Sequence, residues 1–203
     1  MQSMKTLNTV IDTLKCNKVS NPEYNSYLEQ ILVGLMIKIG DSKTQMRELA
    51  EETVMNIAKC TNIGPNAIVT YFIRTHGVPK VTNDFKHLKA RLHSLTNLVK
   101  SFGVGNAEIP LNPVIDFAVR NIENSNNDVR QAAVELIVEC FKVVGNAKLQ
   151  PLLGGVRQNQ MDILLNEFNN VTGVPQDDAL RTEMENMQAK NKKVTPLQIN
   201  RLD

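Results

Sequence analysis

Tryptophan is absent from this chain of 203 residues, and all aromatic residues together make up only 4% of it. Its core must therefore be aliphatic. The chain has 10 glycines and 8 prolines, fewer than we expect of an all-β chain that turns many times. No apolar run approaches the roughly 20 residues of a membrane-spanning helix, and the N-terminal segment lacks the pattern of a signal peptide. We therefore expect a helical protein without a membrane partner.

Cysteines and net charge are also scarce. The cysteines Cys16, Cys60 and Cys140 are far apart in the sequence and form no Cys-x-x-Cys pair, which excludes a zinc or disulfide framework. Each occupies an apolar position of a helical pattern, so we expect buried free thiols, which suit a reducing compartment such as the cytoplasm. Lys and Arg number 23 against 21 Asp and Glu. The resulting net charge of +2 argues against nucleic-acid binding.

Motifs for catalysis and cofactor binding are missing as well. Gly103-Val-Gly105 lacks the rest of a phosphate-binding loop and is interpreted as a linker between helices. His87 and His93 are six residues apart, so they do not share one helix face as a pair of metal ligands would. The sequence contains neither Gly-x-Ser-x-Gly nor His-Glu-x-x-His. We expect no enzymatic activity, no cofactor and no metal.

Helical periodicity is what the sequence has in abundance. From Tyr24 to Ile39 the apolar residues recur at intervals of three and four, and the pattern ends at Gly40, as a helix C-terminus does. The segment 42–45, Ser-Lys-Thr-Gln, is predicted to form a capping box before a second apolar stripe from Met46 to Ala58. Because only a few residues separate the two stripes, we expect an antiparallel helical hairpin.

The same arrangement returns 83 residues later, the offset between Arg47 and Arg130. Helices are predicted at Val114–Ile122 and Val129–Val144, and the offset pairs apolar and loop positions alike. Such an internal match indicates a repeat, and its length is close to twice the 40–47-residue period of HEAT and armadillo hairpins. The sequence therefore predicts an all-α fold, an α-solenoid of antiparallel HEAT-repeat hairpins with no sheet.

One repeat should lie between these two, and another should follow them. The apolar run Ile68–Arg74 is predicted to be a helix, with a strand as the alternative, and the stripe Phe85–Phe102 is predicted to be its partner. A longer loop, 76–84, connects the two. The last hairpin is predicted to join Ala147–Leu153 to Met161–Phe168 through a turn at two glycines.

The two ends of the chain differ from the array between them. Met4–Leu14 is predicted to be a lone helix, so we expect the first repeat to be missing or partial. The array is expected to span residues 1–173. In the remainder, 174–203, the apolar spacing of Leu180, Met184 and Met187 predicts a possible capping helix followed by a flexible tail.

Three segments resemble TOG domains, the tubulin-binding HEAT arrays of microtubule polymerases and their relatives. The segment LMIKIGDSKTQMRELAEETVMNIAKC resembles their central repeat, and LNPVIDFAVRNIENSNNDVRQAAVELIVECFKVVG resembles their fifth. The Gly-Asp-Ser loop, the following Arg-x-x-Ala and the closing NQMDILLNEFNNVTG are most similar to the single TOG domain of the ciliary-tip centrosomal protein family. TOG domains usually have six repeats and often a Trp in the first loop. This chain has room for about four and a half repeats.

The resemblance, which covers Tyr24–Gly173, implies a non-catalytic, monomeric module that binds tubulin. It also implies a place in the cytoplasm on the cytoskeleton, at a cilium or centriole. A HEAT or armadillo scaffold for a partner other than tubulin is the alternative.

In TOG domains the intra-repeat loops at one edge of the array contact tubulin. Each loop ends at a helix N-terminus, which attracts acidic groups. The candidate tubulin contacts in this chain are Ser42, Lys43, Thr44, Lys80, Asn83, Lys86, Ser125, Asn126, Asn127 and Arg157. Arg47 and Arg130 each follow Asp41 or Asn124 by six residues, a spacing familiar from HEAT repeats. They are expected either to contact tubulin or to form a ladder of hydrogen bonds between neighbouring repeats.

Overall fold

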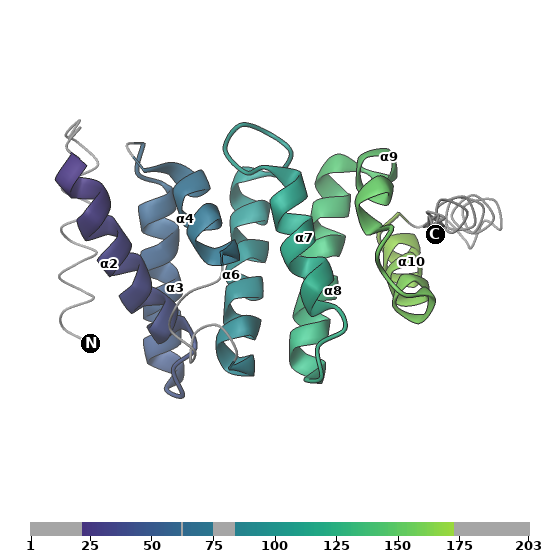
Figure 1. Ribbon diagram of the computed structural model, residues 1–203, viewed down its shortest axis with the longest axis horizontal. Helices are drawn as coiled ribbons and strands as arrows, with labels where there is room; N and C mark the ends of the chain where they lie inside the picture. Colours follow the sequence, from purple (N-terminus) through teal and green to yellow (C-terminus); the bar gives the residue numbers. More distant parts are fainter. Residues whose placement is uncertain (1–21, 62, 75–83, 173–203) are drawn as a thin grey trace, which may run out of the picture.

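Helices form all the regular structure in residues 22–61, 63–74 and 84–172, which the computed structural model describes (Figure 1). The predicted all-α fold without a sheet is confirmed for these residues. The helices are α2 Pro22–Ile39, α3 Thr44–Ala58, α4 Gly64–Ile73, α6 Phe85–Phe102, α7 Leu111–Asn121, α8 Asn127–Val144, α9 Asn146–Leu149, the 3-10 helix η1 Gln150–Leu153 and α10 Gln158–Thr172.

The helices stack as antiparallel hairpins in two layers, with α2, α4 and α7 in one layer and α3, α6 and α8 in the other (Figure 1). The α2–α3 and α7–α8 connections and the N-terminus of α6 lie at the lower edge in that view. The connections between repeats lie at the upper edge. We call residues 38–47, 84–89 and 122–130 the intra-repeat edge, because they bring together the turns within successive hairpins.

The core is mainly aliphatic, as the composition predicts, although it includes Phe72 and the stacked rings of Phe141 and Phe168. The apolar stripes of the sequence face it, and its fully buried residues include Ile39, Leu92, Ile122 and Ile137, each 0% exposed. Phe85 is an exception: the periodicity places it on the buried stripe of α6, but it is 43% exposed. It is the first residue of that helix and lines a cavity.

Glycines end the two longest helices of the second layer at equivalent positions. Gly103 after α6 and Gly145 after α8 have φ angles of 76° and 74°. Their N–H groups donate to Val99 and Phe141, at 2.8 Å and 2.9 Å. A positive φ favours glycine, so both helices end where the sequence allows this backbone turn. Gly103-Val-Gly105 is therefore part of a linker between helices, as interpreted from the sequence.

The predicted helix 147–153 is not continuous. Residues 146–149 form α9, and the chain then tightens into η1. Pro151 lies in the first turn of η1 and has no N–H group to donate to the preceding α-helical turn. The fourth hairpin therefore begins with two short turns, and α10 completes it.

The structure also tests the predictions about the cysteines, the membrane and metal binding. Cys60 and Cys140 are buried, as predicted, and burial raises the pKa of the Cys140 thiol to about 12. Cys16 and the segments 4–14 and 174–203 lie outside the described residues. Among the described helices, none combines the length and the apolarity that crossing a bilayer requires. No cluster of metal-ligating side chains occurs within the described ranges.

The arginine Arg91 of α6 is buried, only 2% exposed, and it joins three helices. Its Nε donates to the Phe72 carbonyl at 2.7 Å, and its Nη2 donates to the Arg74 carbonyl at 2.9 Å. Both carbonyls belong to the end of α4, where a helix leaves its acceptors unpaired. The guanidinium carbon also lies 4.8 Å from the centre of the Phe117 ring of α7. Burial lowers the pKa of Arg91 to about 10, so the side chain stays charged at neutral pH.

Removing this side chain should weaken the whole array. We expect Arg91→Ala to lower the free energy of unfolding by about 2–4 kcal/mol, because it leaves buried carbonyls without a donor and opens a cavity. Urea denaturation measures the effect. The control is Arg120→Ala, which removes an exposed arginine beside the same ring and should cost less than about 0.5 kcal/mol. Equal losses in the two variants would contradict this account of Arg91.

Candidate binding edge

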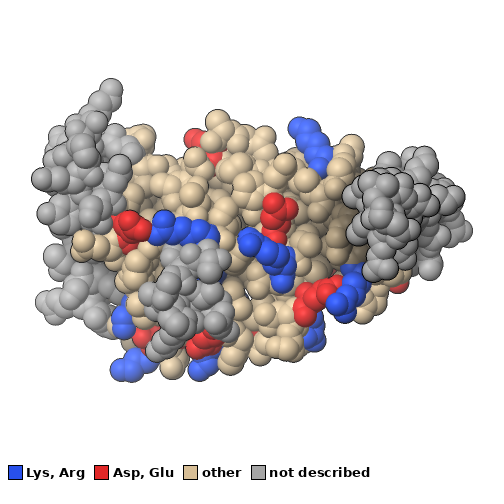
Figure 2. Space-filling view, viewed as in Figure 1, with Lys and Arg blue, Asp and Glu red and all other residues tan. Residues whose placement is uncertain are grey.

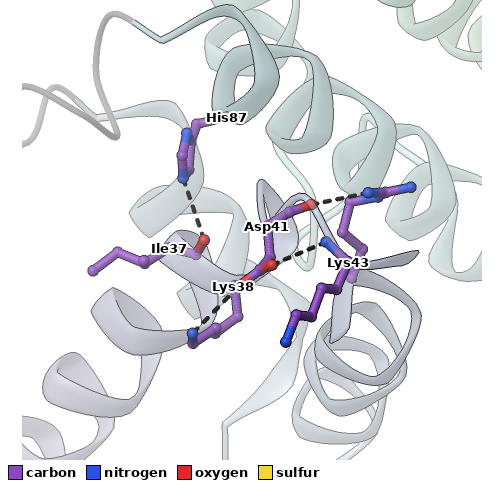
Figure 3. Close-up of polar contacts among 6 residues, drawn as sticks. Ile37, Lys38, Asp41, Lys43 and His87 are labelled. Carbon is purple, nitrogen blue, oxygen red and sulfur yellow. Dashed lines mark hydrogen bonds and ion pairs between the residues drawn. The ribbon is translucent and has the colours of Figure 1, made fainter. Parts of the chain in front are cut away.

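The α2–α3 loop is organised around Asp41 (Figure 3). Its Oδ1 accepts a hydrogen bond from the Lys43 backbone N–H at 3.0 Å, and its Oδ2 lies 3.4 Å from Lys38 Nζ. The Lys43 N–H, more than any other contact, lowers the pKa of the Asp41 carboxyl. The side chain of Lys43 extends away from Asp41, and Figure 3 draws no contact between its ammonium group and the other residues shown.

The capping box predicted at residues 42–45 is wrong. Helix α3 begins at Thr44, and Lys43 at its N-cap makes no side-chain capping bond. Arg47 closes the loop instead: its guanidinium donates to the carbonyls of Asp41 and Ser42 at 2.9 Å and 3.1 Å, and to Thr44 Oγ1 at 3.0 Å. Ser42 cannot cap the helix because the N-cap position belongs to the residue that follows it.

The α7–α8 loop repeats these bonds at an offset of 83 residues. Arg130 donates to the Asn124 and Ser125 carbonyls at 2.7 Å and 3.0 Å, and to Asn127 Oδ1 at 3.0 Å. Asn124 Oδ1 accepts from the Asn126 N–H at 2.9 Å, in the position that Asp41 takes in the first loop. Asn126 in turn caps α8 through the N–H groups of its first turn.

These hydrogen bonds show that the predicted ladder between neighbouring repeats is wrong. Arg47 and Arg130 bind carbonyls of their own loops rather than groups of a neighbouring repeat. Each lies one turn into its helix, so the side chain folds back over the five or six residues before it. These arginines close loops within a repeat.

The N-terminal turn of α6 is fixed against the end of α2. Asp84 Oδ1 caps α6 by accepting from the Lys86 N–H at 2.8 Å. His87 is buried, and its Nε2 donates to the Ile37 carbonyl at 3.2 Å, the contact drawn in Figure 3. Its Nδ1 lies 3.5 Å from Asp84 Oδ2. Against Gly40 the ring lies so close that an added Cβ would be 2.5 Å from it.

Most charges of the intra-repeat edge neutralise one another. Lys89 of α6 lies 2.8 Å from Asp128 of α8, and Arg157 lies 3.0 Å from Glu123. Lys38 pairs with Asp41 in the first loop. Figure 2 shows Lys and Arg side chains along this lower edge with acidic groups between them. Within the described residues, Lys43 and Lys86 are exposed and have no ion-pair partner at this edge.

The predicted contact residues therefore differ in whether their side-chain polar groups are still available to bind a partner. Ser42, Lys43, Lys86 and Ser125 are exposed, and no described group bonds to their side-chain polar atoms. The side chains of Thr44, Asn126 and Asn127 accept hydrogen bonds that close or cap their loops, and Arg157 is held by Glu123. Lys80 and Asn83 lie outside the described residues.

Comparison with known families agrees with the repeat architecture of this edge. Residues 2–168 match the family described as XMAP215/Dis1/CLASP, TOG domain. The chain belongs to the TOG-domain family. The chain is 26% identical to centrosomal protein 224 of Dictyostelium discoideum over 162 residues, and 24% identical to the human centrosomal protein of 104 kDa over 143 residues. These matches cover 77% and 69% of this chain but only 8% and 15% of those proteins.

Solved structures show the same fold. The MAST/Orbit N-terminal domain superposes with a TM-score of 0.71 at 20% identity, over 85% of this chain and 72% of that domain. A second structure, described under TOG-tubulin binding specificity in microtubule dynamics and mitotic spindle formation, gives a TM-score of 0.67 at 21% identity. It covers 82% of this chain and 59% of the other. At these identities the comparison establishes the HEAT-repeat solenoid.

A cavity of about 450 Å³ opens on the intra-repeat edge of this TOG domain. It lies between the α2–α3 loop and α6, next to the start of α8. Glu51 of α3 lines it, and burial raises the pKa of this carboxyl although Arg47 and His93 favour its charged form. The cavity therefore holds a carboxyl group whose burial disfavours its charged form.

The close approach of His87 to Gly40 can be tested by mutation. We expect Gly40→Ala to cost about 1–3 kcal/mol of stability, because the new methyl group meets a buried ring that cannot move aside. The φ of Gly40 is not positive, so the backbone itself tolerates alanine. In a His87→Ala background the same change should cost much less. An equal cost in both backgrounds, measured by urea denaturation, would rule out the ring as the cause.

The Glu51 carboxyl makes stability depend on pH. Its pKa is higher in the folded than in the unfolded chain, so its charge destabilises the fold above the folded pKa, and this cost disappears below the unfolded value, near 4.5. Glu51→Gln should therefore raise the melting temperature at pH 7 and leave it unchanged at pH 4. The control, Glu52→Gln at an exposed position of the same helix, should show no such difference. A gain that persists at pH 4 would be inconsistent with a titration effect.

Proposed function

We propose that this TOG domain binds tubulin through its intra-repeat edge, as a non-catalytic module of a microtubule-regulating protein. Membership of the TOG family supports tubulin as the partner. One observation carries the choice of edge: Lys43 and Lys86 are exposed on consecutive repeats, and neither forms an ion pair with a described residue. Tubulin is an acidic protein, and cations without an ion-pair partner at an interface favour such a partner.

The rigidity of the edge adds to this argument. Arg47 and Arg130 hold the backbone of their loops, and His87 ties α6 to the end of α2. A partner that meets these loops pays little conformational entropy to order them. Candidate contacts are the exposed residues Ser42, Lys43, Lys86 and Ser125, with Thr44, Asn126, Asn127 and Arg157 beside them.

The cellular setting follows from the same family. The chain matches a small part of two centrosomal proteins, so we propose that the full-length protein acts on the microtubule cytoskeleton at a centrosome or cilium. The array of residues 1–173 would supply the tubulin contact there as a single copy. Nucleic acid is not a proposed partner because the net charge is only +2.

Charge reversal at the two free lysines tests the proposed edge. We expect Lys43→Glu together with Lys86→Glu to weaken tubulin binding at least tenfold, measured by co-elution and by titration at low salt. Both positions lie near helix N-termini, where Glu is compatible with the helix dipole, so the melting temperature should not fall. Binding by the parent should also weaken as salt rises from about 0.05 to 0.5 M, since the Debye length shrinks from about 14 to about 4 Å.

The matched control reverses two lysines at the opposite edge. Lys59→Glu with Lys100→Glu changes the net charge by the same amount, at the exposed C-terminal ends of α3 and α6. It should lose a little stability through the helix dipole and keep its tubulin affinity. Loss of binding in the control alone would move the site to the opposite edge. A parent that binds no tubulin would favour a HEAT scaffold for another protein.

A further inference from the structure

Phe85 is an exposed aromatic side chain on the intra-repeat edge. Four large apolar side chains are exposed in the described part of the chain: Phe85, Val143, Ile163 and Val171. Phe85 is the aromatic one, 43% exposed at the first position of α6. That position is capped by Asp84 and needs no aromatic residue for helix formation. In the isolated domain this ring is exposed to water. Burying it against a partner would stabilise the complex through the hydrophobic effect.

The cavity beside Phe85 is lined by apolar and charged residues together. Ile39, Gly40 and Ala90 line it together with Phe85, and so do the charged side chains of Lys86 and Lys89. Its volume of about 450 Å³ is ample for one or two side chains of a partner. An aromatic residue beside an apolar hollow, surrounded by polar groups, has the composition of an interface hot spot.

The charges of the cavity determine what can enter it. Asp41, Glu51 and Asp128 line the cavity together with Arg47, Lys86 and Lys89, so its acidic and basic groups balance and neither sign of charge is favoured inside. Lys43 is exposed, lies outside this lining and has no ion-pair partner among the described residues, so it favours an acidic group beside the cavity. An apolar side chain flanked by acidic residues satisfies both conditions.

We propose that Phe85 and this cavity are the apolar anchor of the tubulin interface and receive an apolar tubulin side chain flanked by acidic residues. The proposal rests on the tubulin-binding function proposed above. In this proposal the lysines and the anchor have different roles. The lysines attract and orient an acidic surface, and the apolar anchor stabilises the complex once water is excluded.

Phe85→Ala tests the anchor. We expect it to weaken tubulin binding tenfold or more while leaving the slope of log Kd against log salt unchanged, because it removes no charge. Val143→Ala is the control: Val143 is 46% exposed near the C-terminal end of α8, at the opposite edge, and its loss should not change the affinity. The melting temperature of each variant shows whether it remains folded.

Ala90→Leu tests the cavity while keeping Phe85. The larger side chain fills the hollow from α6 and should also weaken binding about tenfold. If the parent binds tubulin and either Phe85→Ala or Ala90→Leu binds as tightly as the parent, the anchor proposal is overturned while the proposed function stands. If the parent does not bind tubulin, both are overturned. Weaker binding by both folded variants, with an unchanged salt slope, supports the anchor.

Discussion

The last carbonyl groups of a helix have no donor within that helix, and the loop that follows adds further unpaired carbonyls. In the hairpins α2–α3, α4–α6 and α7–α8, an arginine of the second helix donates to carbonyls at the end of the first helix or in the loop after it. Arg47 and Arg130 do so from the fourth residue of α3 and α8. Arg91 does so from the seventh residue of α6, about one turn deeper, and is therefore buried. A guanidinium suits this role because its several N–H groups can reach two carbonyls at once.

The closed turns determine what the intra-repeat edge can offer a partner. Because Thr44 and Asn127 accept hydrogen bonds from the closing arginines, they have less capacity for new bonds. Lys89 and Arg157 are held by ion pairs. Lys43, Lys86 and the exposed ring of Phe85 remain, two cations and an apolar group at the same edge. The proposed interface therefore combines salt-dependent attraction with a smaller apolar contact.

The sequence predicts the fold well because helical periodicity and the 83-residue offset are local patterns. The same offset relates the bonds of Arg47 to those of Arg130, so the repeat extends to individual contacts. The hydrogen bonds and ion pairs of the intra-repeat edge are less predictable, because each polar group has several possible partners nearby. Ser42 does not cap α3, because the hydrogen bonds of Asp41 give the loop another conformation. Ion pairs such as Lys89–Asp128 join different helices and so depend on how the helices stack. Phe85 fits a buried stripe by spacing, and only the cavity beside it shows why it is exposed.

Amide hydrogen exchange of the domain with and without tubulin tests the central claim most directly. Exchange reports backbone protection at each segment and requires no mutation. We predict that tubulin slows exchange in residues 40–46, 84–89 and 122–129, while the opposite edge at 103–110 and 145–149 exchanges as in the free domain. Protection confined to the opposite edge, or to the faces of the two layers, would contradict the assignment of tubulin binding to the intra-repeat edge.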